Sequence, residues 1–133
     1  MLLGFEHIGM TSGNMDRSIA FYCDLLGLKL RLRKVNESNE VAFLDAGGGM
    51  LEIIAPRDGA GRFRDVPMSE AGMRHLTLAY ASVDAMFEKL ELAGVEVVER
   101  PRDANNKEMI RRVAFVRDPD GIIVELIERA EGR

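Results

Sequence analysis

The stretch RVAFVRDPDGIIVELIE (residues 112–128) decides the fold. The runs on either side of DPDG are rich in Val, Ile and Phe, which is typical of strands, and DPDG itself is a turn signal. The sequence therefore predicts a β-hairpin. In its second strand Glu125 stands between Val124 and Leu126. A carboxylate isolated in an apolar strand is costly unless it is paired or ligated, so Glu125 is a candidate functional residue.

A similar pattern occurs in the first half of the chain. VAFLDA (residues 41–46) and MLEIIAP (residues 50–56) read as strands, and three glycines separate them. The second of these strands carries Glu52, again between two apolar residues. Because strand side chains alternate between faces, the apolar neighbours can pack under a helix while the glutamate projects from the other face.

Each of these hairpins lies downstream of a strand-like segment that carries a histidine. His7 occurs in FEHIGM (residues 5–10) and His75 in GMRHLTLAY, and the chain has no other histidine. The histidines are 68 positions apart and the glutamates 73, so the two halves are nearly in phase. Two imidazoles and two carboxylates are enough to bind one divalent metal ion, with positions left for water or substrate.

The remaining pattern predicts one helix in each half. Asn14 and Ser82 are suitable N-caps, and Gly27 and Gly94 suit the left-handed position after a helix end. With the strands at 3–10, 28–35, 73–80 and 95–100, the element order is βαβββ, twice. We therefore predict an α+β fold in which two βαβββ repeats form a cupped, partly closed mixed sheet with the helices on its outer face.

The whole chain, residues 1–133, is expected to form one domain made of two modules. The first module spans residues 1–56 and the second residues 73–133. Residues 57–72 are rich in Gly and charge and lack hydrophobic periodicity, so they are expected to link the modules.

Composition limits the functions open to the chain. A net charge of −4 argues against nucleic acid as a partner, and no apolar run approaches the length needed to span a membrane. The one cysteine, Cys23, suits a reducing compartment and is read as a core residue of the first helix. We expect a cytoplasmic protein that acts on a small molecule.

At these residues the chain resembles the vicinal oxygen chelate superfamily, which includes glyoxalase I, bleomycin-binding proteins and extradiol dioxygenases. HIGMTSGNMDRSIAFYCDLLGLKL (residues 7–30) looks like the opening strand and helix of that family, and residues 112–128 look like its closing hairpin. The resemblance covers nearly the whole chain, and it implies a homodimer. Because proteins with this fold catalyse many different reactions, the resemblance specifies the fold more closely than the function.

The set His7, Glu52, His75 and Glu125 is similar to the metal ligands of glyoxalase I. By that resemblance the ion is zinc, nickel or cobalt; it polarises substrate oxygens and stabilises an enediolate. Glu125 or Glu52 then moves a proton between adjacent carbons. Thr11 and Pro56 stand where glyoxalase I carries an arginine and an asparagine that bind glutathione, so these two glutathione-binding residues are missing.

Two alternatives remain open. An enzyme of the methylmalonyl-CoA epimerase type uses similar ligands and also moves a proton next to a carbonyl, although DPDG differs from the Lys-Ser type turn usual there. A non-catalytic binding or resistance protein would need aromatic side chains that line its ligand site. The chain has no Trp, two Tyr and six Phe, which makes this alternative the weaker one. Dioxygenases and fosfomycin transferases use three ligands, which leaves Glu52 without a role.

Basic residues are further candidates for contact with an anionic substrate. Lys29, Arg31 and Arg33 alternate with leucines along residues 28–35 and are expected to share one face of that strand. Arg112 is a second candidate, in the closing hairpin. A solvated strand face is the simpler explanation for the same pattern.

Overall fold

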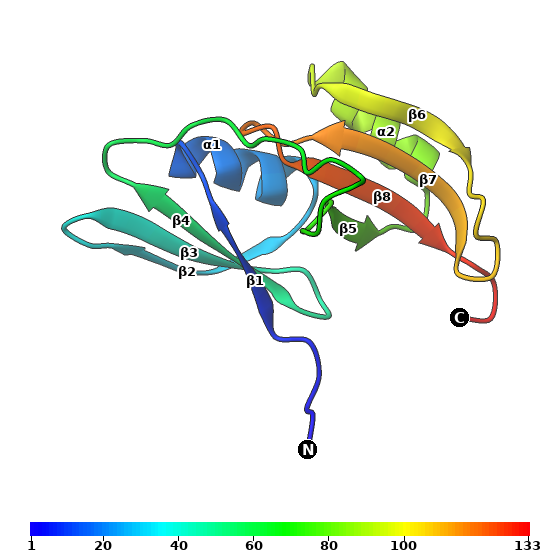
Figure 1. Ribbon diagram of the computed structural model, residues 1–133, viewed down its shortest axis with the longest axis horizontal. Coiled ribbons are helices and arrows are strands. Elements are labelled where there is room, and N and C mark those ends of the chain that lie inside the picture. Colours follow the sequence, from blue (N-terminus) through cyan, green and yellow to red (C-terminus); the bar gives the residue numbers. More distant parts are fainter. The chain divides into compact units, whose positions relative to one another are not determined.

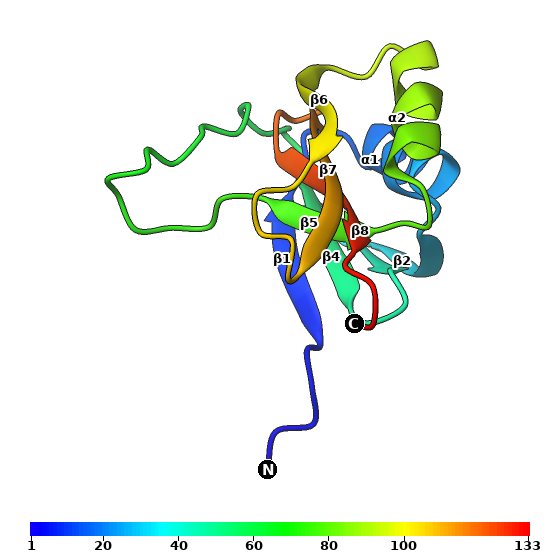
Figure 2. The ribbon, with the colours of Figure 1, turned by 90° about the vertical axis from the view of Figure 1, so that its right-hand side faces the viewer.

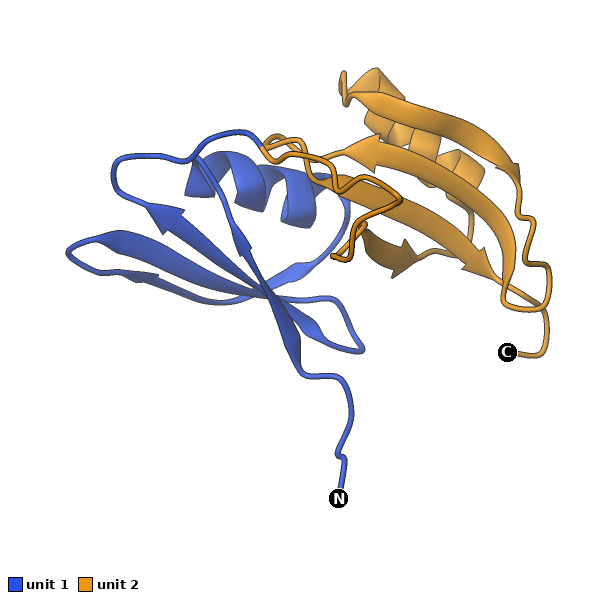
Figure 3. Ribbon diagram, in the orientation of Figure 1, with its two compact units in different colours: residues 1–62 blue, residues 63–133 orange.

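The structure is a computed structural model that describes residues 1–133 (Figure 1). Its contacts divide the chain into two compact units, residues 1–62 and 63–133, and the boundary falls inside the stretch expected to be a linker (Figure 3). Each unit contains one four-stranded mixed sheet and one helical segment. The predicted α+β fold with two βαβββ modules is therefore confirmed.

The first unit has the strand order β1-β4-β3-β2. Parallel pairing joins β1 to β4, and the other two pairs are antiparallel. Its helical segment lies against one face of the sheet (Figure 1). The elements are β1 (His7–Thr11), α1 (Met15–Ile19), its π-helical continuation (Ala20–Leu25), β2 (Lys29–Val35), β3 (Asn39–Asp45) and β4 (Met50–Pro56).

The second unit repeats this topology with the strand order β5-β8-β7-β6. Again the first strand pairs in parallel with the last, and the rest of the sheet is antiparallel. The helix α2 packs on one face of this sheet (Figure 2). The elements are β5 (Leu76–Ala79), α2 (Val83–Leu92), β6 (Val97–Asp103), β7 (Ile110–Arg117) and β8 (Ile123–Arg129).

The helix ends are those that the sequence predicts. Asn14 Oδ1 accepts a hydrogen bond from the Arg17 backbone N–H at 3.0 Å, and Ser82 Oγ accepts one from Ala85 at 3.1 Å. Gly27 and Gly94 adopt positive φ of 89° and 79°, where a side chain would be strained. None of the helices has the length and apolar character needed to cross a membrane.

One face of each sheet is buried against its own helix. In the first unit Leu51 and Ile53, the neighbours of Glu52, are at most 2% exposed. In the second unit Val124 and Leu126, the neighbours of Glu125, are fully buried. The predicted alternation is therefore present around both glutamates, and it puts their side chains on the face of the sheet that the helix does not cover.

The two histidine strands are shorter than the sequence suggests. In β1 pairing begins at His7, which is opposite Met50, the first residue of β4. In β5 it begins at Leu76, opposite Val124 of β8. The glycine turn before β4 and the DPDG turn before β8 end the partner strands, so residues 3–6 and 73–75 lie outside β1 and β5. Of these, Glu6 still accepts a backbone hydrogen bond from Met50 at 2.9 Å.

The closing hairpin turns tightly at DPDG. The Asp118 carboxylate accepts hydrogen bonds from the backbone N–H groups of Asp120 and Ile122, at 2.8 and 2.9 Å. Gly121 has φ of 90°, which completes the turn. This turn fixes the register in which Phe115 of β7 is opposite Glu125 of β8.

Candidate functional site

In the second unit His75 and Glu125 come together on the uncovered face of the sheet. His75 Nδ1 lies 3.2 Å from Glu125 Oε2. The Thr77 hydroxyl donates a hydrogen bond of 2.8 Å to the same carboxylate oxygen and lies 3.0 Å from His75 Nδ1. The Glu125 side chain is only 10% exposed, against 34% for His75, so this carboxylate is both buried and fixed.

In the first unit His7 and Glu52 form the corresponding pair, but a looser one. His7 Nε2 lies 4.0 Å from Glu52 Oε1, and the side chains are 37% and 29% exposed. Gly9 takes the place that Thr77 has in the second unit, because Gly9 is opposite Glu52 as Thr77 is opposite Glu125. Glu52 therefore has no hydroxyl from that position to hold it.

Each pair has an aromatic neighbour that sequence reasoning missed. Phe43 is opposite Glu52 and meets His7 edge-on, with ring centroids 5.5 Å apart. Phe115 is opposite Glu125 and meets His75 in the same way at 5.6 Å. Phe43 precedes its glutamate by nine residues and Phe115 precedes its own by ten, which is the signal that could have identified them.

The face around Glu125 also carries buried apolar side chains. Val113 and Ile127 are opposite each other in β7 and β8, two residues along the strands from Phe115 and Glu125. They pack with Ala104, and all three are at most 7% exposed. The carboxylate therefore borders an apolar surface, where electrostatic interactions are stronger than in water.

The donor set fits a divalent ion of the zinc, nickel or cobalt type, which imidazole and carboxylate both bind. Two ligands at bond lengths near 2.1 Å on a tetrahedral ion are about 3.4 Å apart. The ring nitrogen to carboxylate oxygen separations of 3.2 and 4.0 Å are close to this value. Each unit brings together one such pair, His7 with Glu52 and His75 with Glu125, and no group of three or more possible ligands is present.

The predicted basic residues are engaged by carboxylates. Arg31 binds Asp45 at 2.8 Å. Arg33 binds both Asp16 of the α1 segment and Glu40, each at 2.8 Å. The expectation that Lys29, Arg31 and Arg33 share one face is wrong, because a register shift between Leu30 and Leu32 interrupts the alternation and leaves Arg33 on the helix side.

Arg112 is engaged on the helix side of the second sheet. Its guanidinium binds Asp84 at the start of α2 and Asp103 of β6, at 2.9 and 3.1 Å. This double pairing raises the pKa of Arg112 and lowers that of Asp84. Substrate binding by Arg31, Arg33 and Arg112 stays a prediction, and it requires these carboxylates to be displaced.

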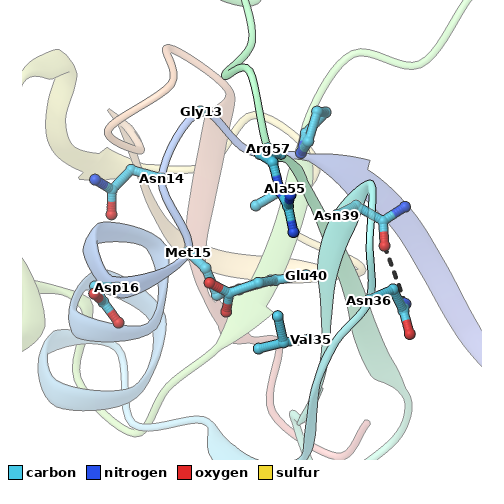
Figure 4. A pocket seen from close by; sticks show the side chains of 11 residues that line it. Gly13, Asn14, Met15, Asp16, Val35, Asn36, Asn39, Glu40, Ala55 and Arg57 are labelled. Carbon is cyan, nitrogen blue, oxygen red and sulfur yellow. Dashed lines mark hydrogen bonds between the residues drawn. The ribbon is translucent and has the colours of Figure 1, made fainter.

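A separate cavity of about 280 Å³ lies in the first unit (Figure 4). It is lined by the residues before and at the start of α1, by the β2–β3 turn and by the end of β4. Asp16 and Glu40, which face it, are already paired with Arg33, and Asn36 donates to Asn39. Neither His7 nor Glu52 lines this cavity, so it is distinct from the histidine–glutamate pair.

Comparison with known proteins supports the fold and the family. A solved structure of glyoxalase I from Zea mays superposes with a TM-score of 0.79 at 25% identity, covering 96% of this chain and 45% of that chain. TnmS3, an antibiotic-binding protein from Streptomyces sp. CB03234, superposes with a TM-score of 0.72 at 20% identity over 97% of this chain and 98% of its own.

A curated relative, the probable lactoylglutathione lyase of Vibrio cholerae, is 31% identical over 133 residues, which cover 94% of this chain and 90% of that protein. The family model described as Glyoxalase/Bleomycin resistance protein/Dioxygenase superfamily matches residues 4–126. The chain belongs to this superfamily.

Proposed function

We propose that the chain is a metal-dependent isomerase or lyase of the glyoxalase I type. The observation that carries the proposal is the duplicated site: in each unit a histidine, a glutamate and a phenylalanine occupy matching positions of the sheet. The recurrence of all three residue types at matching positions favours a functional role over separate structural roles. Similarity to a probable lactoylglutathione lyase supports the same reading.

In this proposal His7, Glu52, His75 and Glu125 serve as the protein ligands of a divalent ion. When bound, the ion draws electron density from substrate oxygens and makes a proton on the neighbouring carbon more acidic. A glutamate carboxylate accepts that proton and returns it to the adjacent carbon. One C–H bond breaks and another forms, so the isomerisation consumes no external oxidant or reductant.

The substrate class is a small molecule with two neighbouring oxygens or a thioester. The apolar surface formed by Val113, Ile127 and Ala104 beside Glu125 suits the carbon skeleton of such a substrate and keeps water away from the carboxylate. Thr11 and Pro56 end β1 and β4, where glyoxalase I is expected to grip glutathione, so thiols other than glutathione belong in the assay.

The test begins with the metal content of protein purified without a tag and without chelators. We expect about one Zn, Ni or Co per chain, lost in the His7→Ala/His75→Ala double variant. Glu37→Gln, a change in an exposed carboxylate of the β2–β3 turn, is the control and should keep the metal. Metal-loaded protein is then assayed with methylglyoxal hemithioacetals of several thiols and with methylmalonyl-CoA. Protein that takes up no metal would contradict the proposal.

A second candidate is a non-catalytic small-molecule binding protein. The observation that favours it is the presence of Phe43 and Phe115 beside the two histidines, because aromatic rings are the surfaces on which planar ligands stack. The effect of a chelator distinguishes the binding protein from the enzyme. A binding protein takes up its ligand equally well with and without chelator, whereas the enzyme loses activity when the metal is removed.

We also expect a cytoplasmic homodimer. Light scattering of the purified protein measures the mass directly, and a monomer at micromolar concentration would contradict this expectation.

A further inference from the structure

We infer that Arg117 is a positioning residue for His75, because it fastens to the second sheet the loop of residues 63–74 that leads into this histidine. The inference rests on the proposed function only in the role that it gives to His75, and it concerns the second unit alone. Three features support it: the place of His75 just outside β5, the ion pair of Arg117 with Asp65, and the contacts that close the loop.

His75 lies one residue before the point where strand pairing begins. The parallel pairing of β5 with β8 starts at Leu76, so the chain enters the sheet directly after His75. The imidazole nevertheless has a defined place: Nδ1 lies 3.2 Å from Glu125 Oε2, and the ring packs against Phe115. The position of the imidazole beside these two side chains therefore depends in part on how the preceding loop is held.

Arg117, the last residue of β7, faces the same side of the sheet as Glu125. Val116 is fully buried and is opposite Val124, on the side that the helix covers. Because side chains alternate along a strand, Arg117 lies on the other side, two residues from Phe115. A segment that binds to Arg117 is therefore drawn to the face of the sheet that carries the His75–Glu125 pair.

Two contacts fasten the start of the 63–74 loop to the closing hairpin. The Arg117 guanidinium donates two parallel hydrogen bonds of 2.8 Å to the Asp65 carboxylate, and Nη1 also donates to the Gly121 carbonyl at 2.8 Å. The Phe63 backbone N–H donates to the Asp120 carbonyl at 2.9 Å. The Arg117 side chain is only 18% exposed, so water screens its charge less than that of a surface arginine. A paired bond of this kind fixes the direction of the carboxylate as well as its position.

The end of the 63–74 loop is tied back to its start. Figure 2 shows the loop as a long projection that returns to β5. The Arg74 guanidinium donates hydrogen bonds to the backbone carbonyls of Val66 and Glu70, the latter at 2.9 Å. Gly72 packs so closely on Val66 that a Cβ built on it would lie 3.1 Å from both methyl carbons. Because Arg74 directly precedes His75, the anchored start of the loop sets the place from which His75 enters the sheet.

These contacts form a continuous link from the closing hairpin to His75. Loss of the Arg117–Asp65 pair would release the loop, and the imidazole would then take several orientations relative to Phe115. The simpler alternative is a loop that only stabilises the unit. In that case loss of the pair would lower the free energy of unfolding but leave the His75 ring in place in the folded protein.

Nuclear magnetic resonance of the metal-free protein measures the position of His75 directly. The chain has two histidines, one in each unit, and His75→Ala assigns their ring signals. In the unaltered protein we expect nuclear Overhauser effects between the rings of His75 and Phe115 and between those of His7 and Phe43, whose centroids are 5.6 and 5.5 Å apart. The pair in the first unit is an internal control. Because no metal is used, the result does not depend on whether the proposed function is correct.

Asp65→Asn and Arg117→Gln each remove the ion pair and keep a side chain of similar length. Glu96→Gln is the matched control, because it removes the other carboxylate beside Arg117, 3.2 Å from Nε, and leaves Asp65 in place. Circular dichroism establishes that each variant is folded. If Arg117→Gln does not fold, Asp65→Asn tests the same pair at a carboxylate that is 49% exposed.

We expect Asp65→Asn and Arg117→Gln to weaken or abolish the effect between His75 and Phe115 and to shift the ring signals of His75. The ring pair of the first unit should be unchanged. The double variant should behave like either single variant, since both remove one interaction. Glu96→Gln should give the spectrum of the unaltered protein.

Limited proteolysis gives a second measurement of the loop. Trypsin should cleave native Asp65→Asn or Arg117→Gln after Arg64 on the order of 10-fold faster than it cleaves the unaltered protein, because the released loop opens more often. Cleavage at the unaltered rate in both variants would show that the pair does not hold the loop, and it would overturn the inference.

An unchanged effect between His75 and Phe115 in both variants would also overturn it, even with faster cleavage, because the loop would then be held without positioning His75. Equal weakening of the ring pair in the first unit would do the same, since the change would be global. A failure of the proposed function would instead appear in the metal analysis of the unaltered protein and would leave these signals as they are.

Discussion

The Phe115 ring and the His75 imidazole pack edge to face, with centroids 5.6 Å apart and ring planes at 72°. Edge-to-face packing of this kind restricts the rotation of the histidine and contributes about 1 kcal/mol beyond the apolar area that it buries. Phe43 and His7 pack in the same way in the other unit, with centroids 5.5 Å apart, so the contact occurs in both repeats.

Phe115→Leu should lower the free energy of unfolding of the metal-free protein by about 1 kcal/mol and weaken metal binding. The reason is that leucine fills the apolar cluster but has no aromatic ring to pack against His75. Urea denaturation and metal titration measure the two effects. Phe43→Leu is the matched variant in the first unit. Metal affinity that is unaffected in both variants would mean that the rings serve stability alone.

Glu125 and Glu128 lie three residues apart on opposite faces of β8 and should respond differently to substitution. Glu128 is 9% exposed; its carboxylate accepts a hydrogen bond of 2.8 Å from the Val83 backbone N–H at the start of α2 and pairs with Arg111 at 3.1 Å. It satisfies an N–H group at the helix N-terminus, where negative charge is also favoured.

We therefore expect Glu128→Ala to cost about 2 kcal/mol of stability, because a buried N–H group loses its partner. Metal binding in the folded protein should be retained. Glu125→Gln should show the opposite result, with lost metal affinity and a smaller change in stability. Urea denaturation and metal analysis of both variants make the comparison, and equal metal loss in the two would contradict the assignment of separate faces.

The helix caps give a prediction that is independent of function. Asn14→Ala and Ser82→Ala should each destabilise the protein by about 1 kcal/mol, since each removes the acceptor of an N-terminal N–H group. The exposed residues Asn105 and Ser69 provide the controls Asn105→Ala and Ser69→Ala, which should change stability by less than about 0.5 kcal/mol. Thermal or urea denaturation measures all four variants.

The order of elements was predictable because each signal acts locally. A capping residue, a glycine past the helix end and the alternation around Glu52 or Glu125 depend on neighbours within a few positions. The structure confirms these signals at Asn14, Ser82 and Gly94. Strand ends were less predictable, because the length of β1 depends on where its partner β4 begins.

The features around the candidate site were less accessible because they depend on register between strands. Nothing local in the sequence indicates that Thr77 is opposite Glu125, and only the nine-residue spacing across the hairpin points to Phe43 as the residue opposite Glu52. The register shift in β2 had a similar consequence: a single irregularity between Leu30 and Leu32 was enough to move Arg33 to the helix side. Such irregularities leave no clear trace in an alternating sequence.

Cys23 should be an unreactive thiol. Burial, with the nearby charge of Asp24 as the smaller cause, raises the pKa of Cys23 above the ordinary value for a thiol. Because only the thiolate is nucleophilic, iodoacetamide should alkylate the native protein at pH 8.5 more slowly than it alkylates glutathione or the urea-unfolded chain. The chain has a single cysteine, so mass spectrometry follows the reaction without interference.

The effects of burial and of the Asp24 charge on the pKa of Cys23 can be measured separately. Asp24→Asn removes the negative charge and should speed alkylation of the native protein, but by less than unfolding does, because burial is the larger cause. A raised pKa in the folded state also means that the native protein holds this proton longer than the unfolded chain. Its contribution to stability is therefore complete below the ordinary thiol pKa and is lost as the pH rises through the folded-state value. Alkylation of native and unfolded protein at equal rates would contradict both statements and would make Cys23 an accessible thiol.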